Sequence, residues 1–184
     1  NPERGFNFGE LALKLLEAHH SSQTEPEIRF IVAHYLRPWR EHQRNILTEL
    51  SSVGQIALAT GNLEYAARGA SAYCALSFWV GKDLDTVVRD CLEQGEAIRA
   101  LKQLPNLWQV DLIRQSATLL NLPYVEDTSL ALNADAKRDR GVRFSWHLLQ
   151  AFISYIFNKE TAALELIRLA EQDLEVVRGT AEQG

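Results

Sequence analysis

The sequence has 184 residues, of which 46% are hydrophobic and 23% charged, as is typical of a globular domain and not of a disordered chain. The formal net charge of -5 disfavours a general nucleic-acid-binding protein, because such proteins usually carry a basic face. No apolar run reaches the roughly 18 residues that cross a membrane, so no membrane partner is expected. The two cysteines, Cys74 and Cys91, fall inside helical patterns, which favours a reducing, cytoplasmic compartment.

Helix-forming residues dominate the chain, and its five prolines and ten glycines leave few points at which a helix must break. Apolar residues recur at steps of three and four, whereas the alternation typical of strands has little support. We therefore predict an all-α protein with about eight helices, helix in more than about 65% of residues and no sheet. In chain order, the predicted helices cover residues 8–19, 25–37, 38 or 41 to 60, 63–80, 84–102, 105–121, 142–157 and 161–177.

Capping residues and prolines set several of these boundaries. Thr24 is predicted to cap the second helix, and Asp83 is predicted to cap the fifth. Pro38 should end the second helix just before it, because the residue that precedes a proline disfavours helical geometry. Trp39 is predicted to anchor this bend by burying its large ring. Residues 122–141 lack a regular pattern and are predicted to form a long connection, with a short helix around Leu130.

The periodicity also predicts which side chains are buried. Leu11 and Leu15 belong to the apolar stripe of the first helix, and Leu166 and Ile167 belong to that of the last. Aromatic side chains at helical spacing are predicted to pack in the core rather than to form a ligand cage. They are Phe78, Trp79, Trp108, Phe144, Trp146 and Phe152.

Two segments share a spacing that resembles the tetratricopeptide repeat, in which a glycine makes a tight turn between two helices and small residues let those helices approach. In the first segment, Gly54 lies seven residues before Gly61 and Ala66 lies five residues after it. The same offsets recur at Ala151, Asn158 and Ala163. We predict degenerate tetratricopeptide-like antiparallel hairpins in an α-α superhelix, with Ala66 buried close to Gly54. An ordinary helical bundle with short turns is the alternative.

Longer stretches carry a resemblance to a known family. They are Leu36-Arg37-Pro38-Trp39-Arg40-Glu41-His42, Thr60-Gly61-Asn62-Leu63-Glu64-Tyr65-Ala66-Ala67, Tyr73-Cys74, Gly81-Lys82-Asp83-Leu84 and Glu96-Ala97-Ile98-Arg99-Ala100-Leu101-Lys102-Gln103. Through them the chain resembles the helical region of bacterial multidomain signalling proteins that join a serine/threonine kinase-like domain, an AAA-type ATPase, a GAF domain and a sensor histidine kinase. The resemblance covers most of residues 8–178 and is strongest at 36–103. It implies a regulatory or relay role and carries over no kinase or nucleotide-binding residue.

The sequence contains no methionine, even at its first position. We therefore expect residues 1–184 to be a single helical-repeat domain cut from a larger multidomain protein.

Motifs of nucleotide-binding, hydrolytic and metal-dependent enzymes are missing from the sequence. Gly81-Lys82 lacks the upstream glycine and the following hydroxyl of a phosphate loop, and no G-x-S-x-G, C-x-x-C or H-E-x-x-H occurs. Glu17 and His20 form one Glu-x-x-His pattern, but the second copy that di-iron bundles use is missing. We therefore expect no catalytic, cofactor-binding or metal-binding residues, no cofactor and no enzymatic activity in this chain.

Basic residues gather around the predicted bend at Pro38. Arg37, Arg40, His42 and Arg44 could attract a phosphate or a carboxylate there. A charged corner that is solvated and binds nothing is the simpler interpretation.

Two functional hypotheses follow from these observations. The leading one is a non-catalytic protein-interaction and signal-relay module, whose concave face would hold a peptide, a neighbouring domain of the parent chain or a second copy in a homodimer. The alternative is a helical domain that senses a small molecule, and a standalone helical enzyme is a weaker third hypothesis. A deep pocket with converging polar groups would favour the alternative, whereas a shallow groove with an apolar patch would favour the interaction module.

Overall fold

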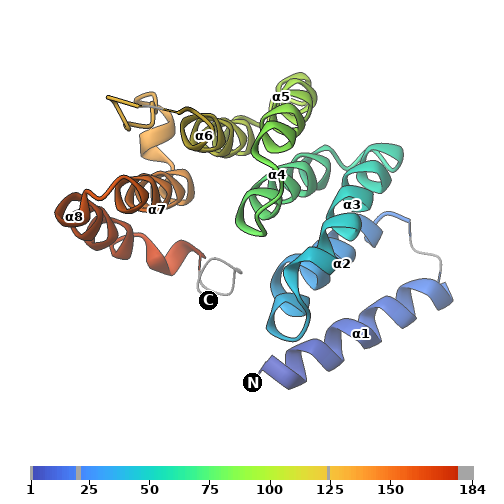
Figure 1. Ribbon diagram of the computed structural model, residues 1–184. Helices are drawn as coiled ribbons and strands as arrows, with labels where there is room; N and C mark the ends of the chain where they lie inside the picture. Colours follow the sequence, from blue (N-terminus) through green and yellow to red (C-terminus); the bar gives the residue numbers. More distant parts are fainter. Residues whose placement is uncertain (1, 20–21, 124, 178–184) are drawn as a thin grey trace. The chain divides into compact units, whose positions relative to one another are not determined.

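The computed structural model describes residues 2–19, 22–123 and 125–177, and 79% of them are helical, with no strand among them (Figure 1). The all-α class predicted from the sequence is confirmed. The described residues form two compact units, one ending at Val80 and the other beginning at Gly81. That they act as a single repeat domain stays a prediction.

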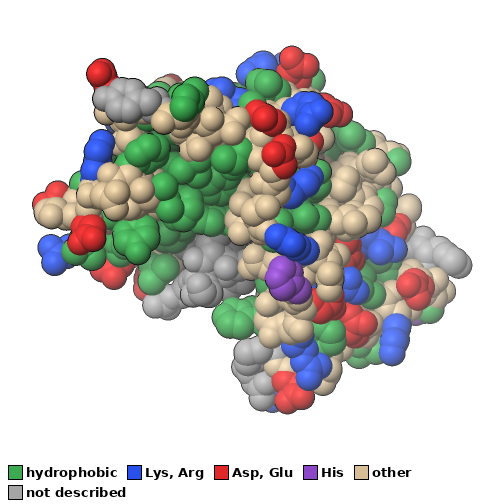
Figure 2. Space-filling model, viewed as in Figure 1, with side chains coloured by type: hydrophobic (Ala, Val, Ile, Leu, Met, Phe, Trp, Pro, Cys, Tyr) green, Lys and Arg blue, Asp and Glu red, His purple; other side chains and the backbone are tan. Residues whose placement is uncertain are grey.

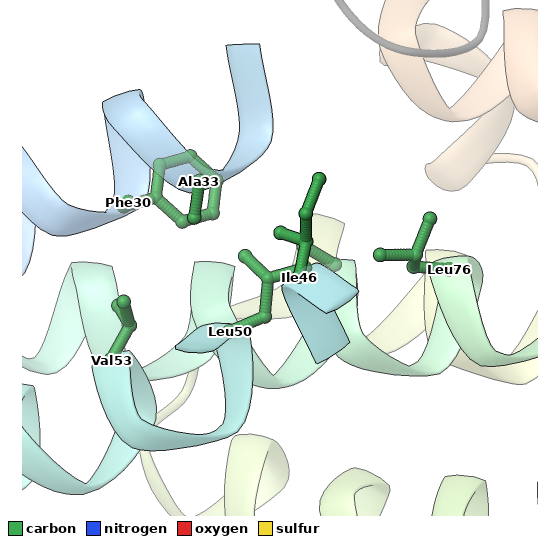
Figure 3. Close-up of a cluster of buried hydrophobic side chains, with 7 residues drawn as sticks. Phe30, Ala33, Ile46, Leu50, Val53 and Leu76 are labelled. Atoms are coloured by element: carbon green, nitrogen blue, oxygen red, sulfur yellow. The ribbon is translucent and has the colours of Figure 1, made fainter. Parts of the chain in front are cut away.

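The first unit contains three long helices, with a series of short helical segments between the first and the second. Its elements are α1 (Pro2–His19), α2 (Glu25–Ile31), the π-helix η1 (Val32–Leu36), the 3-10 helices η2 (Arg37–Trp39) and η3 (Gln43–Ile46), α3 (Leu47–Ala59) and α4 (Leu63–Trp79). Buried side chains from five of these elements form its core (Figure 3): Phe30, Ala33, Ile46, Leu50, Val53, Ala72 and Leu76. Burial of each large aliphatic side chain stabilises the unit by about 1.5–3 kcal/mol, so this cluster holds α2 and the π-helix against α3 and α4.

The bend around Pro38 is more irregular than the sequence predicts. The N–H of Arg37 donates to the carbonyl of Val32, five residues back, which is the hydrogen bond of a π-helix. The next long helix begins at Leu47 and not near Glu41, because His42 is extended and its Nδ1 accepts the N–H of Arg44 at 3.2 Å. The prediction that Trp39 anchors the bend by burying its ring is wrong, since this side chain is 52% exposed.

The α3/α4 hairpin confirms the repeat geometry predicted for its turn. Gly61 adopts a φ of +74°, and the N–H of Asn62 donates to the carbonyl of Ala57 at 2.8 Å, as in a Schellman motif. Ala66 is 3% exposed, and a Cβ added to Gly54 would lie 3.7 Å from the Ala66 carbonyl oxygen. The prediction that Ala66 is buried next to Gly54 is therefore confirmed.

The closest approach of α3 and α4 occurs at Gly69, which the repeat pattern does not single out. A Cβ at this position would lie 3.1 Å from the backbone nitrogen of Gly54, and 3.3 Å from the carbonyl oxygen of Leu50. Both neighbours are backbone atoms of α3, so they cannot move aside as a flexible side chain would. The close approach of α3 and α4 thus depends on two glycines that face each other, Gly54 on α3 and Gly69 on α4.

The second unit consists of two further hairpins and a long connection. Its elements are α5 (Leu84–Ala100), α6 (Leu104–Leu120), the 3-10 helix η4 (Ala136–Arg138), α7 (Arg140–Ile156), α8 (Glu160–Glu171) and the 3-10 helix η5 (Leu174–Val177). Helix α5 packs against α6, α6 against α7, and α7 against α8. Asp83 caps α5 as predicted, its Oδ1 accepting the N–H of Thr86 at 3.0 Å. Thr24, by contrast, makes no side-chain capping bond at the start of α2.

Both hairpins of the second unit repeat the turn seen at Gly61. Asn158 has a φ of +57°, and the N–H of Lys159 donates to the carbonyl of Ser154 at 2.8 Å. This confirms that Asn158 takes the place of the turn glycine. Lys102 has a φ of +58° and makes the same kind of turn, although its side chain gave no signal for it. Gly95 precedes it by the seven residues that separate Gly54 from Gly61.

Several predicted buried faces are wrong. Leu11 and Leu15 are each 50% exposed, because α1 meets the π-helix through small residues instead. A Cβ on Gly9 would lie 2.8 Å from Cδ1 of Leu36. On the last helix, Ile167 is 43% exposed.

Helix α8 ends at Glu171 rather than continuing to residue 177. Just beyond it, the buried carboxylate of Asp173 forms ion pairs with Arg140 at 3.0 Å and Arg143 at 2.6 Å, both at the start of α7. These two arginines hold the pKa of Asp173 below its usual range, mainly through the hydrogen bond from Arg143. This charged contact ties the segment after α8 to the start of α7.

The aromatic side chains divide between the core and the surface. Phe78 and Phe144 are buried, as predicted, but Trp79 is 36% exposed. The remaining three, Trp108, Trp146 and Phe152, are half-buried. Neither Cys74 nor Cys91 forms a disulfide, and both are buried, Cys74 in α4 of the first unit and Cys91 in α5 of the second.

Candidate functional site

The connection between α6 and α7 contains a short non-helical segment, residues 128–131, which we call the self-peptide, so the short helix predicted around Leu130 is wrong. The side chains of Thr128 and Leu130 are buried, whereas those of Ser129 and Ala131 are exposed. This alternation with a period of two is typical of an extended chain that turns one edge toward a protein surface. A non-helical backbone in such a place needs hydrogen-bond partners for its N–H and C=O groups.

Gln150 of α7 supplies two of these partners. Its Oε1 accepts the N–H of Leu130 at 2.6 Å, and its Nε2 donates to the carbonyl of Thr128 at 2.8 Å. The Gln150 side chain is itself buried, so each of these bonds forms away from solvent. Its amide occupies the position that the backbone of a neighbouring strand would take in a sheet.

Gln115 of α6 binds the self-peptide in the same way from the other side. Its Oε1 accepts the N–H of Ala131 at 2.8 Å, and its Nε2 donates to the carbonyl of the same residue at 3.1 Å. The same Nε2 also donates to Asp111 Oδ2 at 2.8 Å, which fixes the orientation of the amide. Two amides on neighbouring helices thus bind one extended backbone.

Two further side chains complete this arrangement. The indole Nε1 of Trp146 donates to the carbonyl of Leu130 at 2.9 Å, and Nζ of Lys159 donates to the hydroxyl of Thr128 at 2.8 Å. We call the set of Gln115, Trp146, Gln150 and Lys159 the amide clamp. Its chemistry is that of binding, because the clamp contains hydrogen-bond donors and acceptors but no nucleophile beside a base.

A separate pocket lies between α5 and α6. Its volume is about 300 Å³, at the small end of ligand-binding cavities. A Cβ on Gly95 would meet only Leu107 and Val110, both at an ordinary 3.8 Å, so the missing side chain leaves space here. Trp108 and Arg114 also line the pocket. The Arg114 guanidinium pairs with Asp111, another residue of the pocket lining, at 2.6 Å.

The predicted anion corner has its positive charges paired with groups of the protein itself. Arg37 forms ion pairs with Glu49 and with Glu10, the latter at 3.4 Å, and Arg40 pairs with Glu3 at 3.2 Å. The guanidinium of Arg44 donates to the backbone carbonyl of Val80 at 2.9 Å, and His42 caps η3. In the face of the first unit seen in Figure 2, basic and acidic side chains are interspersed. Binding of an anion at this corner stays a prediction.

Two groups near this corner have shifted pKa values. Burial raises the pKa of Glu49, and this effect exceeds the opposing effect of the nearby Arg37 guanidinium. In the π-helix, burial lowers the pKa of His34 to about 4. Its ring stacks on Phe30 at 5.1 Å between centroids and meets Tyr35 edge-on at 4.8 Å. His34 is therefore neutral at pH 7 and belongs to the packing of the bend.

Within residues 2–19, 22–123 and 125–177, no group of three or more His, Cys, Asp or Glu side chains is arranged to hold a metal ion. His20, the second member of the Glu-x-x-His pattern, lies outside the described residues. In the same part of the chain, no helix combines the length and the apolar character that crossing a membrane requires.

Comparisons with known proteins do not assign the chain. No family model matches the sequence, and neither a curated protein nor a solved structure matches it. The amide clamp and the α5/α6 pocket are therefore interpreted from their own geometry.

The sequence pattern singled out neither the clamp nor the pocket. One signal for the clamp was nevertheless present, because Gln150 interrupts an apolar run between Leu149 and Ala151 on a helix that is otherwise buried there. A polar side chain at a core position usually has a fixed hydrogen-bond partner. Gln115 and Lys159 give no such signal, since they occupy positions where polar residues are ordinary.

Proposed function

We propose that this chain is a non-catalytic protein-interaction and signal-relay module of a cytoplasmic multidomain ATPase and sensor kinase. The observation that carries the proposal is the amide clamp, in which Gln115 and Gln150 bind the backbone of an extended segment. Hairpins with this capability are suited to hold a peptide or a loop of a neighbouring domain. The resemblance of residues 36–103 to the helical region of such signalling proteins supports the choice of parent.

A peptide-display selection on the purified chain tests the proposed interaction function. We expect extended peptides to be enriched, and their synthetic copies to bind the chain measurably in solution. If no selected peptide binds the chain in solution, the interaction function is wrong. A peptide that binds anywhere on the chain supports it.

The α5/α6 pocket favours a second candidate function, that of a helical domain that senses a small molecule. Trp108 could stack on a planar ring, and Arg114, which pairs with Asp111 at 2.6 Å, has further N–H donors that could bind an acidic group on that ring. Aromatic carboxylic acids are therefore suitable probes, with binding followed by quenching of tryptophan fluorescence. Binding that Trp108→Ala abolishes would favour sensing. If no member of the series bound, the sensing function would be wrong.

A further inference from the structure

We propose that the amide clamp is a docking site for an extended peptide of a partner protein, and that the self-peptide occupies this site in competition with the partner. This inference rests on the proposed interaction function and names its partner by chemistry. The partner segment carries a hydroxyl side chain and, two residues later, an aliphatic one.

The clamp recognises the backbone more than the side chains. Five of its hydrogen bonds go to main-chain groups of Thr128, Leu130 and Ala131. Any extended chain presents the same N–H and C=O groups at the same spacing. Binding therefore does not depend on the self-peptide's own covalent connection to α6 and α7.

Two side chains give the site its selectivity. The hydroxyl of Thr128 accepts a hydrogen bond from Lys159 at 2.8 Å, and Leu130 is 3% exposed. A partner needs a group that accepts from an ammonium at the first position and an apolar group that fills the buried position. The exposed side chains of Ser129 and Ala131 leave the alternate positions unrestricted.

The self-peptide lies in a long connection between two helices and not inside a helix. The connection runs from residue 121 to residue 139, between the end of α6 and the start of α7. A tethered segment of this kind competes at an effective concentration in the millimolar range. A free peptide should therefore bind the unmodified chain weakly, and weakening of the self-peptide should make the site available.

The probe is a fluorescent synthetic peptide with the sequence of residues 126–133, Glu-Asp-Thr-Ser-Leu-Ala-Leu-Asn. Its affinity is measured by fluorescence anisotropy on the unmodified chain and on Leu130→Ala. This substitution weakens the self-peptide and leaves every clamp residue intact. We expect the dissociation constant for the probe to fall by about tenfold or more.

Leu122→Ala is the matched control, because it removes the same atoms from the same connection at a side chain that is 48% exposed. It should leave the affinity for the probe unchanged. Adding Gln150→Leu to Leu130→Ala should abolish the gain, and a probe with Asp in place of its first leucine should not bind.

An affinity of folded Leu130→Ala equal to that of the unmodified chain would overturn the inference. If Leu130→Ala does not fold, Thr128→Ala replaces it, with an expected gain of about threefold. An unchanged affinity in that variant overturns the inference as well. If displayed peptides bind but Gln150→Leu leaves their affinity unchanged, the interaction function stands and the docking site proposed here is wrong.

Discussion

The α3/α4 and α5/α6 hairpins have the same turn but different helix interfaces. At both turns a residue with positive φ is followed by a hydrogen bond to the carbonyl five residues back, from Asn62 in one and from Gln103 in the other. In α3/α4, Gly54 lies opposite Ala66 and Gly69, and the backbones almost touch. In α5/α6, Gly95 lies opposite Leu107, and a pocket remains. The turn fixes how two helices are connected, whereas the residue opposite the glycine decides whether the interface is closed or hollow.

The largest expected loss of stability follows a substitution at Gly69, in the closed α3/α4 interface. Gly69→Val would place its side chain against the backbone of α3, where the nearest atom is 3.1 Å from a Cβ. The helices must separate, and we expect a loss of about 3 kcal/mol in the free energy of unfolding. Chemical denaturation followed by circular dichroism measures it. A loss below about 0.5 kcal/mol would show that the interface is not closed at this point.

Ala66→Leu should have a smaller effect on the same hairpin. Ala66 is buried at 3% exposure, and three further carbon atoms would overpack the interface at a cost of about 2 kcal/mol. Glu64→Leu, at an exposed position on the same helix, is the control and should change the stability by less than about 0.5 kcal/mol. Equal denaturation midpoints for the two variants would contradict the hairpin interpretation.

Gly95→Ala should raise the free energy of unfolding, whereas the two substitutions in α4 lower it. Its Cβ would meet Leu107 and Val110 at an ordinary 3.8 Å, and alanine favours the helix more than glycine does. We expect the free energy of unfolding to rise by about 0.5–1 kcal/mol. Calorimetry of this variant beside Gly69→Ala gives the sharpest form of the comparison, because only the α5/α6 interface has room. If Gly95→Ala lowered the free energy of unfolding, the α5/α6 pocket would not tolerate even a methyl group at this position.

The smallest expected effect concerns ATP, for which we predict no binding and no hydrolysis by the isolated chain. The α5/α6 pocket contains Arg99 and Arg114 but no backbone loop that could surround phosphates. Isothermal titration with ATP and Mg²⁺ and a phosphate-release assay check this. ATP turnover that copurifies with the chain and disappears in Arg114→Ala would contradict the prediction.

Local chemistry explains what the sequence could predict. Gly61 and Asn158 favour a left-handed turn by themselves, and Asp83 favours a helix start, so these features were predicted correctly. Lys102 adopts the same turn conformation although lysine does not favour it, because packing of the two helices imposes the geometry. The π-helix also depends on tertiary contacts, since Leu36 packs against Gly9 of a helix far along the chain.

The candidate site could not be predicted from the sequence, because it too depends on contacts between residues that are far apart in the chain. The clamp is defined by bonds between Gln150 and residues about twenty positions earlier in the chain, which no local spacing encodes. The pocket is defined by a missing side chain at Gly95, and a glycine inside a helical pattern has several explanations. Only Gln150, a polar side chain inside an apolar run, offered a usable signal.

The buried cysteines give each unit its own reporter of opening. Cys74 is 0% exposed and Cys91 is 1% exposed, so neither thiol can meet a labelling reagent while its surroundings remain closed. The rate of alkylation at each sulfur then follows how often that part of the chain opens. Equal opening free energies at the two sulfurs would mean that the units melt together as one cooperative body. Unequal values would show that one half of the chain opens while the other stays folded.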